Sequence, residues 1–79
     1  MLKLNLAVLT PEKVIFEGEA ERIVIPAEGG VCEILPLHKM FLSRLIAGTI
    51  LIDDKAVPIR RGVVKVSQNK VVIIVEERR

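Results

Sequence analysis

Short runs in which apolar and polar residues alternate constrain the fold of this chain more than any other feature. In the opening segment, one face of an extended chain would carry the apolar residues Leu2, Leu4, Leu6 and Val8. A period of two is typical of a strand with one buried face. Similar runs recur between turn residues at intervals of roughly 8–12 positions, with no long helical pattern among them. The sequence therefore predicts an all-β sandwich or flattened barrel of two sheets, each with about five strands.

Glycine and proline punctuate the part of the chain that follows this first strand. Residues 13–26 predict two short strands with a bend or bulge at Gly18. Residues 31–35 predict another strand, which ends before Pro36. Residues 38–45 are too short for their apolar spacing to distinguish a helical turn from a strand. We expect them to form a loop that leads into a strand.

The second half of the chain predicts two hairpins. Residues 48–59 form the first around an Asp-Asp-Lys turn, and Pro58, which has no N–H to donate, places the returning strand at an edge or beside a bulge. Residues 60–62, with the sequence Arg-Arg-Gly, are expected to separate the two hairpins. Residues 63–77 form the second hairpin, and Gln68-Asn69 is its two-residue turn because asparagine tolerates a positive φ.

The length of 79 residues predicts a single domain that spans residues 1–79. Folding at this size hides only about 60–65% of the surface of the unfolded chain, so stability requires a dense apolar core, a partner, or both. Hydrophobic residues make up 51% of the sequence and can supply that core, in which we expect Ile25. No apolar run approaches the roughly 20 residues needed to cross a bilayer, and the N-terminus lacks a signal-peptide pattern, so we expect a cytoplasmic protein.

Charge is unevenly distributed along the chain, although the net charge is only +2. Residues 12–33 contain six acids against two bases, and residues 39–70 contain seven bases against two acids. Such an asymmetry can steer a charged partner, and it equally fits a well-solvated surface. Nucleic acid is a poor fit as a partner, because only Phe16 and Phe41 could stack on a base.

The sequence offers no convincing catalytic, metal-binding or cofactor-binding group. Nucleophilic catalysis would have to combine Cys32 with His38, and nothing marks this thiol as more than a small, half-buried side chain. One cysteine and one histidine cannot supply the three or four ligands of a zinc site. We therefore expect no catalytic residue, no metal and no cofactor. Met40 and Phe41 either form a contact surface or fold back onto the core.

Three segments in a fixed order form a further pattern. They are LTPEKVIFEGEAERIVIP (residues 9–26), ILPLH (residues 34–38) with the following LSRLIAG, and VKVSQNKVVIIVE (residues 64–76). In order and spacing they resemble the N-terminal β-sandwich domain of the epsilon subunit of F-type ATP synthases, which is the delta subunit in mitochondria. The resemblance covers nearly the whole chain and rests on the three segments together.

This resemblance implies a non-catalytic rotor subunit of the central stalk, which couples proton flow to ATP synthesis. The sandwich would bind the gamma subunit and rest one end on the c-ring, at the inner face of the cell membrane without inserting into it. By position in the family, the contact residues would be Thr10, Glu28, Gly30, Val31, His38, Met40, Phe41, Leu42 and Ser43. His38 would then be a docking residue, and a loop histidine with no partner is the alternative.

The chain also departs from the family pattern. Val31 stands where the family has a loop glutamate, Leu37 where it has a glycine, and Arg60-Arg61 where it has Ser-Gly, which implies rewritten gamma or c-ring contacts. We expect the family's C-terminal helical hairpin to be absent, so its restraint of ATP hydrolysis and its ATP binding are not carried over. The alternatives are a stand-alone β-sandwich adaptor or homo-oligomer, and a small enzyme that uses the cysteine and the histidine.

Overall fold

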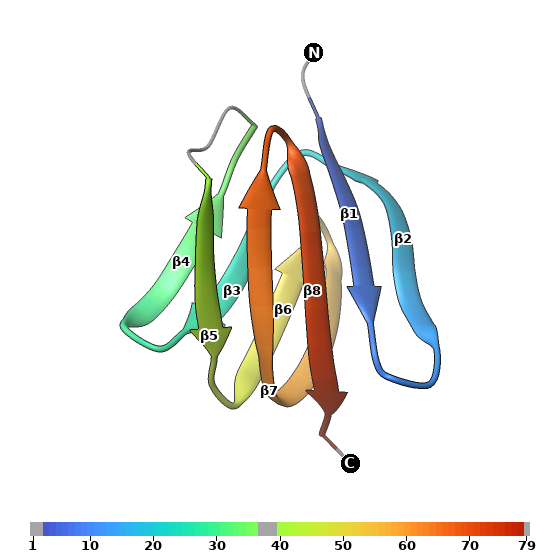
Figure 1. The fold of residues 1–79 in the computed structure, drawn as a ribbon, viewed down its shortest axis with the longest axis vertical. Helices are drawn as coiled ribbons and strands as arrows, with labels where there is room; N and C mark the ends of the chain where they lie inside the picture. The colour runs from blue at the N-terminus through green and yellow to red at the C-terminus, as the bar shows by residue number, and fades with distance from the viewer. Residues whose placement is uncertain (1–2, 37–39, 79) are drawn as a thin grey trace.

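The structure is a computed structural model that describes residues 3–36 and 40–78, and all regular secondary structure in them is β-strand (Figure 1). The strands are β1 (Leu4–Leu9), β2 (Val14–Ala20), β3 (Ile23–Ala27), β4 (Gly30–Ile34), β5 (Phe41–Leu45), β6 (Gly48–Ile52), β7 (Lys55–Ser67) and β8 (Lys70–Glu77). The predicted all-β sandwich is confirmed. No helix long and apolar enough to span a membrane occurs in the described part of the chain.

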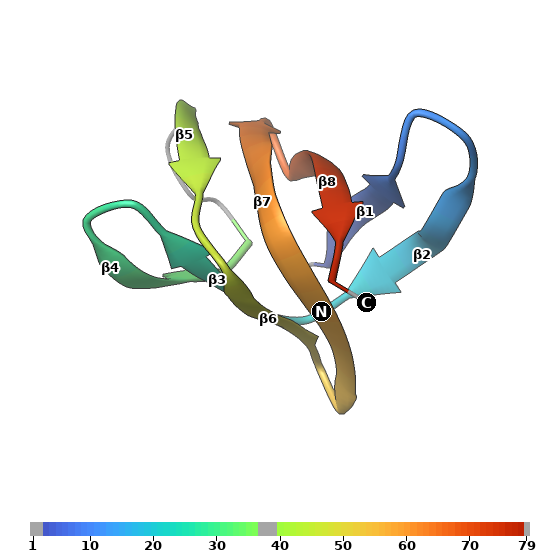
Figure 2. The ribbon, with the colours of Figure 1, turned by 90° about the horizontal axis from the view of Figure 1, so that it is seen from below.

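The long strand β7 belongs to both layers of the sandwich. Its second half lies in a five-stranded layer of order β2-β1-β8-β7-β5, in which β1 and β8 are parallel and the other neighbours antiparallel. Its first half pairs with β6, which pairs with β3, which in turn pairs with β4. Figure 2 shows the five-stranded layer above and the hairpin of β6 and β7 at the bottom. Sharing one strand lets a short chain build two layers.

A β-bulge at Arg60 lets β7 bend from one layer into the other. Ile59 and Arg61 pair with the adjacent residues Glu77 and Glu76, so Arg60 is an extra residue in β7. An extra residue in one strand bends that strand and increases its twist. We expected the Arg-Arg-Gly segment to separate two hairpins. This expectation is wrong, because the segment lies inside one continuous strand of 13 residues.

Turn chemistry fixes the connections between the strands. Gln68 (φ 49°) and Asn69 (φ 64°) both adopt the left-handed conformation in the predicted two-residue turn between β7 and β8. Asp53, in the turn between β6 and β7, accepts hydrogen bonds through its carboxylate from the backbone N–H groups of Glu21 (3.1 Å) and Arg22 (3.1 Å). This contact ties the tip of one hairpin to the connection between β2 and β3.

The core lies between the two layers and consists of aliphatic side chains. Leu4, Leu6 and Val8 of β1 are buried, as predicted from the alternation, and Ile25 is fully buried in β3. Among the described residues, no polar or charged side chain is buried. Burial of apolar area is therefore the main stabilising contribution to this domain.

Two local expectations are wrong, and one is confirmed. β2 continues through Gly18 without a bulge or break, because Gly18 pairs in register with Leu6, and the irregularity lies where β2 faces the end of β1. Residues 41–45 form a strand, not part of a loop, because each of them pairs with a residue of β7. Pro58 pairs with Thr49 of β6 beside the bulge, as its missing donor predicts.

Candidate functional site

The face of the five-stranded layer that points away from the core, which we call the outer face, carries apolar side chains on neighbouring strands. On β8, the residues that point to the outer face alternate with the buried residues Val71, Ile73 and Val75. Strand pairing aligns the outer-face residues in two adjacent rows, Glu17, Ala7, Val72, Lys65 and Leu42 in the first and Val14, Leu9, Ile74, Val63 and Arg44 in the second. Each row thus has an apolar centre.

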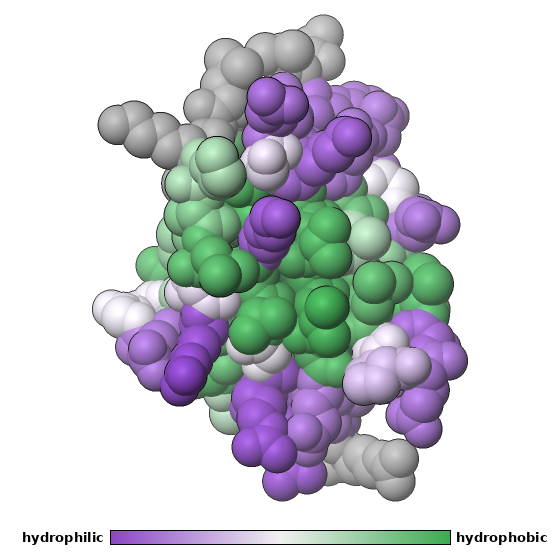
Figure 3. Space-filling model, viewed as in Figure 1, coloured by the Kyte–Doolittle hydropathy of each residue, from purple (hydrophilic) through white to green (hydrophobic). Residues whose placement is uncertain are grey.

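The centre of the outer face is open to solvent despite its composition. Val63, Val72 and Ile74 are exposed by 42%, 39% and 45%, and Leu42 at the margin by 73%. Figure 3 shows a broad hydrophobic area on this side of the molecule, with a hydrophilic side chain in its upper part and hydrophilic residues around it. Contiguous apolar area with a polar border is typical of surfaces that bind other proteins.

The outer face contains two shallow hollows. One, of about 490 Å³, lies across β5, β7 and β8 and is lined by Arg44, Arg61 and Ile74 among others. The other, of about 460 Å³, lies across β2, β1 and β8 and is lined by Ala7, Glu17 and Val72 among others. The first hollow has two arginines at its border, and the second has carboxylates of β2. The outer face can therefore accept protruding side chains of a partner.

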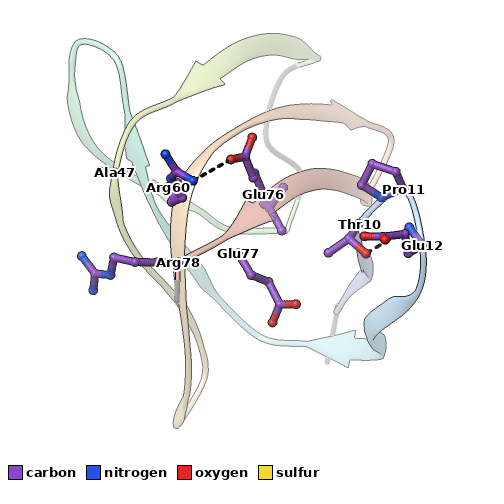
Figure 4. A pocket seen from close by; sticks show the side chains of 9 residues that line it. Thr10, Pro11, Glu12, Ala47, Arg60, Glu76, Glu77 and Arg78 are labelled. Carbon is purple, nitrogen blue, oxygen red and sulfur yellow. Dashed lines mark hydrogen bonds and ion pairs between the residues drawn. The ribbon is translucent and has the colours of Figure 1, made fainter.

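A third hollow, of about 730 Å³, lies at the end of the layer where β8 ends, beside the turn between β1 and β2 (Figure 4). The carboxylate of Glu76 lies on its wall, with one oxygen 3.2 Å from Nη1 of Arg60 and the other 3.0 Å from Nε of Arg61. The hydrogen bond and charge of Arg61, helped by the charge of Arg60, lower the pKa of Glu76 from its ordinary value of 4.5. Two successive residues reach one carboxylate because the bulge interrupts the alternation of the strand.

Thr10, a predicted contact residue, closes the turn between β1 and β2. Its hydroxyl oxygen accepts hydrogen bonds from the backbone N–H groups of Glu12 (3.2 Å) and Lys13 (3.0 Å). Thr10 also lines the third hollow. The side chain therefore has a structural role of its own in this turn.

Three other predicted residues lie together. Glu28, Leu42 and Ser43 line a hollow of about 580 Å³ with Arg44 and Val63, which also line the first hollow of the outer face. The backbone N–H of Glu28 donates a hydrogen bond of 3.1 Å to the carbonyl oxygen of Arg44, which joins the turn between β3 and β4 to β5. This part of the predicted contact surface is continuous with the outer face.

Among the other predicted residues, Gly30 and Val31 begin β4, and Met40 and Phe41 lie where β5 begins. Gly30 has a φ of 133°, which favours glycine, and Val31 beside it is 80% exposed on β4. Met40 is 72% exposed, whereas Phe41 is partly buried and packs against the core. The structure thus separates the two residues that the sequence left undecided. His38 lies outside the described residues.

Val63, Val72 and Ile74, at the centre of the outer face, were not among the predicted contact residues. A sequence signal for them exists, because residues 71–75 are apolar without interruption. A strand that is apolar on both faces is expected to be covered on both. That signal indicates a second covered surface but does not tell which alternate set faces the core.

No group of three or more His, Cys, Asp and Glu side chains among the described residues is placed to hold a metal ion. Cys32 is partly buried against the core, and its Sγ lies 3.9 Å from the carbonyl oxygen of Glu33. Its position matches the half-buried side chain expected from the sequence.

A small β-sandwich with a broad, exposed apolar sheet face belongs to the class of protein-binding domains. Residues 3–78 match the family described as the β-sandwich domain of the delta/epsilon chain of ATP synthase, and the chain belongs to this family.

Relatives include the ATP synthase epsilon chain of Sulfurimonas denitrificans, 42% identical over 81 residues that cover 96% of this chain and 62% of the relative. The epsilon chain of Campylobacter fetus is 35% identical over 96% of this chain and 63% of its own length. The chain therefore spans somewhat less than two thirds of these relatives.

Solved structures share the fold. A chain of the mitochondrial ATP synthase of Euglena gracilis superposes with a TM-score of 0.85 at 20% identity, covering 95% of this chain and 51% of that one. A chain from the central stalk and c-ring structure of Tetrahymena thermophila mitochondrial ATP synthase gives 0.77 at 20% identity, covering 96% of this chain and 65% of that one. These similarities support the sandwich architecture described above.

Proposed function

We propose that this chain is a non-catalytic subunit of the central stalk of an F-type ATP synthase and that its outer face binds the gamma subunit. In this role it contributes to coupling proton flow to ATP synthesis, and it is peripheral at the cytoplasmic face of the membrane through the complex. Membership of the delta/epsilon family and relatives that are epsilon chains support the proposal. The observation that carries it is the group of exposed apolar side chains on this face, namely Val72 and Ile74 of β8, Val63 of β7 and Leu42 of β5.

The small size of this apolar area limits how much it alone can contribute to the free energy of binding. Burying an aliphatic side chain completely contributes about 1.5–3 kcal/mol. Val63, Val72 and Ile74 are already more than half buried and Leu42 is 73% exposed, so the four together contribute roughly 4 kcal/mol. Association costs about 4–15 kcal/mol in lost freedom of motion. A stable complex therefore requires further contacts, for which the border of the outer face and its hollows are available.

The turn between β3 and β4 is a candidate for the contact with the c-ring. A side chain added at Gly29 or Gly30 would meet no heavy atom within 4 Å, so the turn projects into open space. Val31, which follows it, is 80% exposed. We propose that this tip, with Glu28, lies against the c-ring while the outer face binds gamma.

The test of gamma binding is a calorimetric titration with the gamma subunit from the same genome. We expect a submicromolar complex with the natural sequence and at least tenfold weaker binding by Ile74→Asp, because a carboxylate would have to be desolvated at the centre of the interface. Leu51→Asp is the matched control, since Leu51 is 43% exposed and Ile74 is 45% exposed. Leu51 lies on β6, in the other layer.

Absence of any complex at micromolar concentration would refute the stalk role. Equal weakening by the two variants would refute the assignment of the interface to the outer face. Sedimentation of the protein alone tests the homo-oligomer alternative. A stable dimer that Ile74→Asp dissociates would favour a homo-oligomer over the stalk role.

The c-ring contact is tested separately by cross-linking. A cysteine introduced by Glu28→Cys, in a Cys32→Ser background, is expected to cross-link to the c-ring in a reconstituted rotor. A cysteine introduced by Lys55→Cys, on the hairpin of β6 and β7, is expected not to. Equal cross-linking from the two positions would contradict the proposed placement.

A further inference from the structure

We propose that the outer face orients its partner by opposite charges on its two halves, with Arg44 and Lys65 contacting carboxylates of the partner and Glu17 contacting a cation. The inference rests on the proposed binding of gamma to this face. It specifies the chemistry of the bound segment as an apolar strip with acidic side chains along one side and a basic side chain along the other.

The cationic half lies on β5 and β7. Arg44 ends the second row beside Val63, and Lys65 lies in the first row between Val72 and Leu42. Both side chains are exposed, and neither forms an ion pair within the described part of the chain. Both cations therefore remain available to a partner while the apolar centre is being covered.

The acidic half lies on β2. Glu17 is opposite Ala7 in the first row, and Glu19 is opposite Asn5 one row further on. Both carboxylates are exposed and likewise form no ion pair with a described residue. Lys70 lines the same hollow as these two glutamates. It pairs with Asn5, so it lies one row away from the two apolar rows.

The two halves cannot neutralise each other within the molecule. Strands β1 and β8 separate them, and in the two apolar rows these strands contribute only Ala7, Leu9, Val72 and Ile74. In contrast, Arg60, Arg61 and Glu76 pair with one another at the end of the layer. When a partner excludes water from the apolar centre, charges within it and beside it interact more strongly with those of the partner and favour one orientation over its reverse.

The inference is tested by measuring affinity for the gamma subunit with the full chain at two ionic strengths. Arg44→Glu, Lys65→Glu and Glu17→Lys are each expected to weaken binding about tenfold and to reduce its salt dependence, because charges at a border act on association and its screening. Lys55→Glu is the matched control for the first two variants. It makes the same change of charge on the hairpin of β6 and β7, and we expect binding within twofold of the natural sequence.

The outcomes separate this inference from the proposed function. If the natural sequence does not bind gamma, the proposed function fails and the inference fails with it. If it binds, and the three variants bind as tightly as the Lys55→Glu control, the orientation by charge is refuted while the stalk role stands. Tighter binding by Arg44→Glu would show the opposite polarity and also refute the inference. So would a dimer of the chain alone that Arg44→Glu dissociates, because the occupant would then be a second copy.

Discussion

Replacing Ile25 with alanine is expected to lower the free energy of unfolding by about 2–5 kcal/mol. Ile25 is fully buried at the centre of β3, where Cys32 of β4 is its paired neighbour. Removing three carbon groups forfeits about 0.8 kcal/mol each, or roughly 2.4 kcal/mol in transfer free energy. The remainder comes from the cavity, because pairing of Ile25 with β4, and of its neighbours Val24 and Ala27 with β6 and β5, limits how far the backbone can collapse.

This loss is large compared with the total stability of the domain. A stability of about 0.05–0.15 kcal/mol per residue gives roughly 4–12 kcal/mol for a chain of this length. One kcal/mol corresponds to about 4–8 °C in melting temperature for a domain of this size. The variant should therefore melt at least about 8 °C below the natural sequence. A loss of about 5 kcal/mol would unfold a domain whose stability is near the lower end of this range.

Urea unfolding followed by circular dichroism measures the difference. The matched control is Val31→Ala, since Val31 pairs with the residue next to Ile25 but is 80% exposed. We expect its free energy of unfolding to change by less than about 0.5 kcal/mol. Equal effects of the two substitutions, or a loss below about 1 kcal/mol for Ile25→Ala, would refute the assignment of the core.

The remaining predictions concern three contacts. Gly62→Ala should destabilise the fold by about 1–3 kcal/mol in urea unfolding, because its Cβ would lie 2.5 Å from a carbonyl oxygen of β8, whereas Gly29→Ala, with open space around it, should not. Asp53→Ala should cost about 1–3 kcal/mol and speed hydrogen exchange of the two N–H groups that Asp53 accepts from. Glu76→Gln should lower the melting temperature at pH 7 and not at pH well below 4.5. The hydrogen bond from Arg61 lowers the folded-state pKa of Glu76, so its ionised form stabilises the fold above pH 4.5 and that contribution is lost as pH falls through the folded-state pKa. Equal melting shifts at both pH values would contradict this last prediction.

The fold could be predicted where the information is local. Alternation in β1 identifies Leu4, Leu6 and Val8 as buried, and the Gln68-Asn69 pair identifies its own turn through the positive φ angles. The continuity of β2 at Gly18 and of β7 at Arg60 could not be predicted in this way. Whether a glycine bends a strand, or an extra residue becomes a bulge, depends on the register of the partner strand, which is a long-range property.

The candidate site was predictable only in part. The resemblance to the family places Glu28, Leu42 and Ser43 on one surface, and the structure brings these three together. It did not point to Val72 and Ile74, because in the sequence they are not distinguishable from the core residues that alternate with them. Only the burial of Val71, Ile73 and Val75 in the folded chain shows which set faces outward.

The bulge at Arg60 connects the architecture to the proposed interface. It bends β7 so that one strand serves both layers, and it brings the Arg60 and Arg61 side chains to Glu76. Immediately after it, Gly62 allows the backbone of β8 to approach closely beneath the first hollow of the outer face. The arginines replace the Ser-Gly expected from the family, yet neither they nor Gly62 has a positive φ. The segment therefore needs no glycine turn, because the extra residue bends the strand and Glu76 holds the two arginines at the end of the five-stranded layer.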